Sequence, residues 1–440
     1  MLGRKIPLNL WSLVSPLAKT FDLMNPVLAD HGLRVAYLAI RIAEELDWPA
    51  WRRREAGIAG ALHDIGAFSL AERLELLAFE TGDLGVHARA GYLLLRRFKP
   101  FERVAESVLY HHLRWENGAG SRSDGKPVPE TSHLLHLADR AAVLLRTEQP
   151  VLKQVPGIRD SIRQRSGSWF VPSYADALLR LCDRDYIWLE IASGAMESSL
   201  RRAIGMETID TDISELLEFS RLVCRIIDFK SEFTATHSSG VAAAGKTLAS
   251  LVGFSRQECM MFEIAAYLHD LGKLAIPSEI LEKRDRLTPD EWNVMRTHVY
   301  YTYQILDPIE VLKLVASWSS LHQERLDGSG YPFRVGGDEL PLGARLMAVA
   351  DVFTGLTESR PYRPGMDRDK ALGVLRGMAD GGELDRRLVL LLETHFDAVQ
   401  RAREEAQTAA VREYESFREC LKGDAAGGKS PGRRPSSPRP

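Results

Sequence analysis

The histidines and aspartates of this chain occur twice in the same order, and this repeat constrains the fold more than any other feature. The first set is His31, His63, Asp64, His87, His111, His112 and Asp139, and the second set is His237, His269, Asp270, His298, His322, Gln323 and Asp351. The offset between matching positions is 206 residues at the first pair and 212 at the last. Random placement would not keep this order with so small a drift. Two copies of one domain therefore lie in tandem.

Apolar residues recur at three- and four-residue spacing through most of the chain, whereas alternating, strand-like runs are scarce. The clearest helical segments are 33–46, 70–79, 174–191, 213–227 and 386–396. Thr288 precedes Pro289 and is followed at the third helical position by Glu291, a typical helix start. Asp212 and Ser214 can cap the helix that runs to Asp228. The sequence predicts an all-α protein made of two tandem helical bundles.

The two copies should meet between residues 193 and 210, before the capped helix. We expect the first domain to span 20–195 and the second to span 208–405. The segment 421–440 is rich in Gly, Pro, Ser and Arg and has no apolar periodicity, so we expect it to be disordered.

Composition excludes several classes of protein. A net charge of -3 and a pI near 6.5 give no general attraction to a DNA or RNA polymer or to anionic lipid. The four cysteines form no CxxC pair, which fits a reducing, cytoplasmic compartment. The N-terminus has no apolar core of the signal-peptide type, and no run approaches the ~20 apolar residues of a membrane span. We expect a soluble, cytoplasmic protein without a membrane partner.

The second set of histidines and aspartates has the chemistry of a metal site. Imidazole nitrogen and carboxylate oxygen together suit Fe, Mn, Zn or Ni, and a bridging carboxylate would hold two ions. Adjacent residues on a helix diverge by ~100°, so His269 and Asp270 can reach different metals. A lone histidine on an apolar face is usually a hydrogen-bonded core residue. Four histidines and two aspartates at repeated spacing favour metal binding instead.

The region 212–397 resembles the HD-GYP family, a branch of the HD phosphohydrolases. The segment 269–273 reads HDLGK and matches the family motif HDxGK, followed by Ile276 and Pro277. The segment 322–332 reads HQERLDGSGYP and matches HHExxDGxGYP at all but one defined position. VADVF at 349–353 and RPYR at 360–363 match the remaining signatures. Chance does not produce this ordered set of motifs.

The resemblance implies an enzyme of second-messenger signalling. Its substrate would be a cyclic dinucleotide, cyclic di-GMP or cyclic GMP-AMP. A hydroxide bridging two divalent ions, Fe or Mn, would cut it to the linear dinucleotide. By position, the implied metal ligands are His237, His269, Asp270, His298, His322, Gln323 and Asp351, with Asp270 as the bridging catalytic carboxylate.

Basic and loop residues would handle the substrate. Lys273 lies one turn after His269, on the same face if the helix persists, and is placed to contact a phosphate oxygen and take part in catalysis. The implied substrate-binding residues are Lys273, Arg360, Arg363, Asp327, Gly330 and Tyr331. The loop 328–332 either shapes the substrate cleft or is a structural turn.

Two positions depart from the family pattern. Gln323 replaces the second histidine of a pair, and an amide oxygen is a weaker ligand than imidazole, so the second metal would be held more loosely. Phe233 stands where some members carry a glutamate for a third metal, so we expect a two-metal site that stops at the linear dinucleotide. Two alternatives stay open: a phosphohydrolase for other phosphates, and a catalytically weak effector that binds cyclic dinucleotide and signals through a partner.

The first copy has the opposite pattern. Its set of candidate ligands is complete, and it consists of His31, His63, Asp64, His87, His111, His112 and Asp139. Its phosphate-handling residues are missing: Ala67 replaces Lys273, no Gly-Tyr-Pro loop follows, and Glu148 would repel a phosphate. It resembles a divergent HD domain. It could be a structural or dimerising partner, a metal-loaded regulatory domain, or a second hydrolase.

Overall fold

The computed structural model describes residues 5–22, 30–68, 70–77, 85–146, 148–204, 208–230, 236–359 and 364–423. Within these residues the protein is all-α, as the periodicity predicts, and its strands form only two short two-stranded sheets. None of the described helices is both long and apolar enough to cross a membrane.

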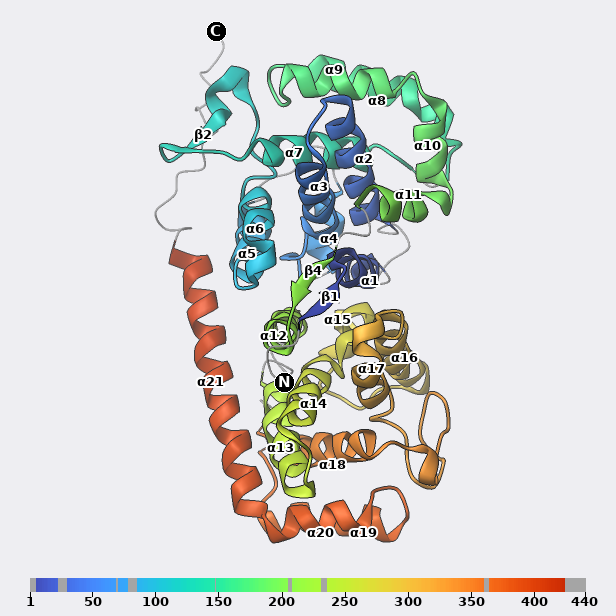
Figure 1. The fold of residues 1–440 in the computed structure, drawn as a ribbon, viewed down its shortest axis with the longest axis vertical. Helices are drawn as coiled ribbons and strands as arrows, with labels where there is room; N and C mark the ends of the chain where they lie inside the picture. The colour runs from blue at the N-terminus through green and yellow to red at the C-terminus, as the bar shows by residue number, and fades with distance from the viewer. Residues whose placement is uncertain are drawn as a thin grey trace.

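The first half of the chain forms the upper bundle of Figure 1. Its helices are α1 (Leu10–Asp22), α2 (His31–Glu45), α3 (Ala50–Leu62), α4 (Leu70–Leu76), α5 (Gly85–Leu95), α6 (Glu102–Leu109), α7 (Glu130–Val143), α8 (Val151–Arg165), α9 (Pro172–Leu181), α10 (Asp185–Ala192) and α11 (Ala195–Ile204). Short 3-10 turns η2 (Lys99–Phe101) and η3 (Glu116–Ser121) flank α6. Helix α2 packs against α3 and α7, and α5 packs against α6.

The second half repeats this arrangement in the lower bundle. Its helices are α12 (Ile213–Lys230), α13 (His237–Val252), α14 (Arg256–Leu268), α15 (Ser278–Leu281), α16 (Pro289–Leu306), α17 (Lys313–Ser320), α18 (Leu342–Thr357), α19 (Arg368–Asp380), α20 (Arg386–Thr394) and α21 (Phe396–Gly423). The 3-10 turns are η4 (Leu271–Ala275), η5 (Glu310–Leu312) and η6 (Gly337–Glu339). Helix α13 packs against α14 and α18 in the way that α2 packs against α3 and α7. Helix α13 also packs against α21.

The two bundles share one hydrophobic core. A single cluster of buried apolar side chains runs from Leu8 to Phe417 through both copies. Phe98 of the upper bundle meets Phe219 of α12 edge-on, with ring centroids 5.6 Å apart. The tandem copies are therefore one packed body, because burial of these surfaces against each other excludes water from both.

Segments near both ends of the chain, which the sequence did not predict, join the two copies. Strand β1 (Ile6–Leu8) pairs antiparallel with β4 (Ile209–Thr211), and α1 contacts α2 and α3 on one side and η4 and α16 on the other. In Figure 1 these elements lie between the two bundles. Helix α21 runs along α13 and reaches α5.

A second small sheet, within the first copy, pairs β2 (Arg122–Ser123) with β3 (Lys126–Pro127).

Local predictions stand, with two corrections. Thr288 and Glu291 form the expected capping box, and Asp212 Oδ1 accepts hydrogen bonds from the backbone N–H groups of residues 214 and 215. The predicted helix 174–191 is two helices, α9 and α10, which break at residues 182–184. Helix α21 continues to Gly423, so the first three residues of the segment predicted to be disordered are helical, and 424–440 lie outside the described residues.

Candidate metal centres

The predicted ligand residues of the second copy come from five helices, at or just beyond the end of three of them and within the other two. They are His237 at the start of α13, His269 and Asp270 after α14, His298 within α16, His322 and Gln323 after α17, and Asp351 within α18. Gly272 explains how the segments come together. A Cβ atom there would lie 1.9 Å from the carbonyl oxygen of His298, so only glycine lets η4 pack on the backbone of α16.

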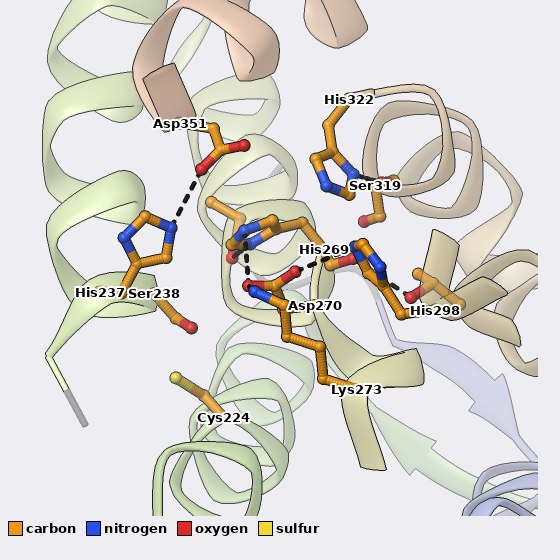
Figure 2. A network of polar contacts seen from close by, with 12 residues as sticks. Cys224, His237, Ser238, His269, Asp270, Lys273, His298, Ser319, His322 and Asp351 are labelled. Carbon is orange, nitrogen blue, oxygen red and sulfur yellow. Dashed lines mark hydrogen bonds and ion pairs between the residues drawn. The ribbon is translucent and has the colours of Figure 1, made fainter. Parts of the chain in front are cut away.

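Asp270 lies at the centre of this cluster (Figure 2). Its Oδ2 lies 3.2 Å from Nε2 of His269, and its Oδ1 lies 3.4 Å from Nε2 of His298. His237 Nε2 lies 3.0 Å from Oδ1 of Asp351. Ligand atoms within 4.8 Å of one another form two groups, His237–His269–Asp351 and His269–Asp270–His322. The two groups have His269 in common, and their imidazole nitrogens and carboxylate oxygens are donors that suit a divalent metal ion.

Three of the histidines are oriented by the same backbone contact. Nδ1 lies 2.7 Å from a carbonyl oxygen in His269 and 2.6 Å in His298 and His322, and each acceptor is three residues earlier in the chain. Each Nδ1 therefore carries the proton, and the lone pair of Nε2 points into the cluster. These three Nε2 atoms are buried and have no hydrogen-bond partner. Such orphaned acceptors fit metal ligands held by their other nitrogen.

The charge states also suit metal binding. Burial lowers the pKa of His298 to about 4 and that of His322 to about 3, so both imidazoles are neutral. Burial alone would raise the pKa of Asp270, but His269 and Lys273 hold it well below its usual range. His298 and His322 can therefore bind a divalent cation without losing a proton, whereas the carboxylate of Asp270 raises the pKa of the adjacent His269 against the effect of burial.

His237 is held differently, by residues that the sequence did not single out. Its Nδ1 lies 3.1 Å from Oε2 of Glu358, which also accepts a hydrogen bond from Nε2 of Gln407 on α21 at 3.2 Å. Burial would lower the pKa of His237, but Glu358 and Asp351 raise it to about 10. Glu358 lies two residues before the Arg-Pro-Tyr-Arg motif. No pattern in the sequence indicated its contact with His237, because the two residues are more than a hundred positions apart.

Lys273 reaches the site by a different route from the one predicted. Helix α14 ends at Leu268, and Lys273 lies in η4, so it does not share a helical face with His269. Its Nζ instead forms an ion pair with Oδ2 of Asp270 at 2.6 Å. The cation therefore lies beside the central carboxylate.

Gln323 lies beside the cluster as a donor. Its Nε2 donates a hydrogen bond to Oδ2 of Asp351 at 3.2 Å, which leaves the other oxygen of Asp351 to face His237. In this arrangement Gln323 orients a ligand, whereas the sequence predicted a direct contact with the metal.

The loop after His322 is held by its own backbone contacts. Asp327 is exposed, and its carboxylate accepts hydrogen bonds from the N–H and hydroxyl of Ser329. A Cβ atom on Gly330 would lie 2.4 Å from Cα of Glu324, so this glycine meets a steric requirement of the turn. The buried Glu324 carboxylate accepts from the N–H groups of residues 333 and 334.

Tyr331 is one of the loop residues predicted to bind the substrate. Arg296 lies over its ring, with the guanidinium carbon 4.6 Å from the centroid, and burial together with Asp351 and Asp270 raises the pKa of its hydroxyl. Arg360 and Arg363 lie outside the described residues, as does Phe233.

The first copy assembles its full set of predicted ligands too. Asp64 Oδ2 lies 3.1 Å from Nε2 of His63, and Oδ1 lies 3.4 Å from Nε2 of His87. His31 Nε2 lies 3.3 Å from Oδ1 of Asp139. The groups with ligand atoms within 4.8 Å are His31–His63–Asp64 and Asp64–His87–His111–His112. Both copies therefore have the same pattern around a central aspartate.

Comparison with protein families agrees with this repeat. Residues 28–144 match one HD-domain model, and residues 221–388 match a second HD-domain model. The chain is a tandem HD-domain protein. Its C-terminal HD domain is HD-GYP-like and its N-terminal HD domain is divergent, as the motifs imply.

The tandem HD-domain protein has curated relatives of similar organisation. It is 27% identical to 3'3'-cGAMP-specific phosphodiesterase 1 of Vibrio cholerae over 90% of this chain and 92% of that protein. It is 31% identical to 3'3'-cGAMP-specific phosphodiesterase 3 of the same organism over 64% of this chain and 60% of the relative. A cyclic di-GMP phosphodiesterase response regulator of Xanthomonas campestris is 36% identical over 41% of this chain and 49% of its own length.

A solved structure shares the fold. The crystal structure of a cyclic GMP-AMP-specific phosphodiesterase from V. cholerae superposes with a TM-score of 0.62 at 21% identity, covering 89% of this chain and 98% of the other. The tandem arrangement of the two HD domains is therefore shared with that protein.

Proposed function

We propose that the C-terminal HD domain is a metal-dependent phosphodiesterase that cuts a cyclic dinucleotide to the linear dinucleotide with two divalent ions, Fe or Mn. The observation that carries this proposal is the position of Asp270, whose two oxygens face different imidazoles. The proposed ligands are His237, His269, Asp270, His298, His322 and Asp351, with Gln323 orienting Asp351.

The residues of this chain have distinct roles in that reaction. A bound metal pair would supply Lewis-acid stabilisation of charge on the phosphate and a water of lowered pKa. Lys273 holds a positive charge beside Asp270, where it can bind a non-bridging phosphate oxygen. Arg296 stacks over the ring of Tyr331, and we propose that Tyr331 contacts the substrate and that Arg360 and Arg363 contact the second phosphate.

The relatives support a particular substrate. A curated relative that aligns over 90% of this chain is named for 3'3'-cGAMP, whereas the cyclic di-GMP phosphodiesterase of X. campestris aligns over 41% of this chain. We therefore propose 3'3'-cyclic GMP-AMP as the preferred substrate, with cyclic di-GMP as the alternative.

The direct test is an assay of both dinucleotides. The protein is loaded with Mn or Fe without oxygen, offered each substrate, and the products are separated by chromatography. Linear dinucleotide should form, and Asp270→Ala should abolish it because the shared carboxylate is lost. Asp64→Ala is the matched change in the other domain. Equal loss of turnover in both variants would contradict the assignment of the reaction to the C-terminal domain.

One observation favours a second candidate function, a cyclic-dinucleotide-binding effector. Gln323 donates to Asp351 and gives the second metal position one imidazole fewer than the N-terminal copy has. Tight substrate binding without a linear product would support this function. If metal occupancy limits the rate, Gln323→His should raise turnover.

A further inference from the structure

A cavity of about 270 Å³ lies between α12, α13, α14 and α21, where the two copies meet (Figure 1). Among the described residues that line it, none is a candidate metal ligand. A cavity of ~150 Å³ can hold benzene, and sites for drug-sized molecules begin near ~300 Å³. The volume therefore suits one ring with substituents. The lining residues that bear on its ligand are Arg225, Asp228, Phe229, Ala406, Ala410 and Glu413.

One end of the cavity has an excess of positive charge. Arg225 pairs with Oε1 of Glu413 at 2.9 Å, and Arg97 of the first copy pairs with the same oxygen. Two guanidinium groups therefore share one carboxylate, and the three groups together carry a net positive charge. Arg225 is only partly buried and lines the cavity, so an anionic ligand can bind to its guanidinium group.

The other polar end is the carboxylate of Asp228. It lies one helical turn beyond Arg225 on the same face of α12. Oδ2 accepts a hydrogen bond from the thiol of Cys224 at 3.3 Å, and Oδ1 accepts one from the hydroxyl of Ser238 at 3.2 Å. A carboxylate has about four lone-pair sites, so each oxygen can accept one more hydrogen bond. An N–H or O–H group of a ligand in the cavity can supply it.

Apolar side chains lie between these two ends. Ala406 and Ala410 are on one face of α21, and their small side chains leave room for a flat group against the helix. The ring of Phe229 also lines the cavity and is held by Phe417, with ring centroids 4.5 Å apart. An aromatic ligand can pack against it. One helical turn is 5.4 Å, close to the length of a single ring with substituents at opposite ends.

We propose that this cavity binds a small aromatic carboxylate that has a hydroxyl or amino group at the far end of its ring. The carboxylate pairs with Arg225, the ring lies on the two alanines, and the hydroxyl or amino group donates to Asp228. A cyclic dinucleotide, with two bases and two sugars, is too large for a cavity of this volume. This ligand is therefore distinct from the proposed substrate.

The walls of the cavity also support His237 of the C-terminal cluster. Ser238, which follows His237 in α13, donates to Asp228 (Figure 2). On the α21 wall, Gln407 donates to Glu358, and Glu358 lies 3.1 Å from Nδ1 of His237. Both contacts are formed in this structure, so a ligand that moves either wall should weaken them. We expect the ligand to lower turnover, a step that rests on the proposed function, whereas binding does not.

Calorimetry with para-hydroxybenzoate tests the binding site. The full-length chain is treated with chelator, so that the carboxylate cannot bind through a metal ion. We expect para-hydroxybenzoate to bind, and benzoate and para-hydroxybenzyl alcohol each to bind about tenfold more weakly, because each lacks one of the two polar groups. No binding of para-hydroxybenzoate, or equal affinity for all three compounds, would overturn the proposal.

Two substitutions test the location. Arg225→Gln removes the charge and should weaken binding of para-hydroxybenzoate at least about tenfold, and Ala410→Leu should abolish binding because its larger side chain fills the cavity. Thr408→Leu, at an exposed position of α21 outside the cavity, is the matched control. Circular dichroism checks the fold, and Ala410→Leu decides the matter should Arg225→Gln unfold. Wild-type affinity in the folded variants would overturn the location.

Turnover of the cyclic dinucleotide by the Mn-loaded chain tests the regulatory step. Saturating para-hydroxybenzoate should lower the rate at least about fivefold, and this inhibition should be absent from Ala410→Leu. An unchanged rate in the wild type, or equal inhibition of Ala410→Leu, would overturn this step. A chain without any turnover would contradict the proposed function alone, because the calorimetry decides the binding site independently.

Discussion

At the scale of single residues, buried polar side chains decide how each ligand is presented. In three histidines of the C-terminal site, Nδ1 donates a hydrogen bond to a backbone carbonyl, whereas Nδ1 of His237 lies against the carboxylate of Glu358. Gln407 of α21 donates a hydrogen bond to the same carboxylate. A carboxylate behind an imidazole makes it a more basic ligand and fixes its ring. Glu358 is therefore a positioning residue, which acts on the metal through His237.

Glu358→Gln should weaken metal retention in the C-terminal site about ten- to a hundredfold, because His237 loses its carboxylate partner. The metal affinity of the variant, measured by competition with a chelator at several pH values, should also depend less on pH, since the pKa of His237 is then raised by Asp351 alone. Gln400→Ala, on the same helix as Gln407, is the control. A variant with wild-type affinity and wild-type pH dependence would assign Glu358 a purely structural role.

Asp228 gives a prediction for the dependence of stability on pH. Burial raises its pKa to about 7, although Cys224 and Ser238 donate hydrogen bonds to its carboxylate. The folded state therefore binds more protons than the unfolded state between pH ~4 and ~7. The contribution of this group to the free energy of unfolding is full below that window and is lost as pH rises through it.

Asp228→Asn should remove this dependence, because the amide carries no ionisable group; its oxygen can accept from one of the two donors, and its NH2 group can donate to the hydroxyl of Ser238. We expect the variant to be more stable than the wild type at pH 8, by on the order of 4 kcal/mol, and the difference to vanish near pH 4. Urea unfolding of the metal-free proteins at both pH values measures this. A gain in stability of equal size at both pH values would show that the charge is not its cause.

At the scale of elements, close backbone contacts bring the ligand-bearing segments together. Gly272 seats η4 on α16, and Gly66 has the same place in the first copy, where a Cβ atom would lie 2.1 Å from the carbonyl oxygen of His87. Both glycines follow a His-Asp pair, so the repeat preserves the contact as well as the ligands. Each glycine fixes the distance between its aspartate and the histidine of the next helix.

Gly272→Ala should lower both turnover and the melting temperature, because the methyl group would push η4 away from His298. Gly66→Ala should leave the metal content of the C-terminal site intact and reduce that of the N-terminal site. Gly373→Ala in α19 is the control, since a Cβ atom there meets nothing within 4 Å. This change should be neutral or stabilising by up to ~1 kcal/mol. Wild-type activity in Gly272→Ala would contradict the steric argument.

At the scale of the whole molecule, the tandem domains are joined by segments from both ends of the chain. Helix α1 lies between the bundles, and α21 contacts α13 and α5 while Glu413 pairs with Arg97 and Arg225. These two helices touch elements that carry ligands of both clusters, including α2, α5, α13 and α16. The two candidate metal clusters therefore belong to one packed body.

Thermal unfolding of the metal-free protein should accordingly show one transition in calorimetry, because the copies share a core. Phe219→Ala removes a ring from the junction and should destabilise the whole protein by ~3–5 kcal/mol. The matched change Phe333→Ala affects an exposed ring and should cost little. Two separate transitions in the wild type, with Phe219→Ala shifting only one of them, would show that the domains unfold independently.

The fold class and the candidate site residues could be predicted from the sequence alone, because they depend on local patterns and residue types. Helical periodicity is a local property, so the all-α class and the two capped helix starts at Asp212 and Thr288 were correctly predicted. The repeat of His31 to Asp139 as His237 to Asp351 identified every residue of both clusters, since ligand chemistry depends on residue type and order. The break between α9 and α10 and the end of α14 before Lys273 were not predicted, because packing against other elements overrides periodicity there.

The sequence by itself determined that one set of histidines and aspartates occurs twice, in an order that predicts two candidate metal sites. Only the tertiary structure decided which oxygen of Asp270 faces which imidazole, that Glu358 and Gln407 support His237, and that Gln323 donates to Asp351. It also decided that β1 pairs with β4 across the domain junction. These contacts join residues far apart in the chain, and their geometry depends on how whole helices pack, which no local pattern encodes.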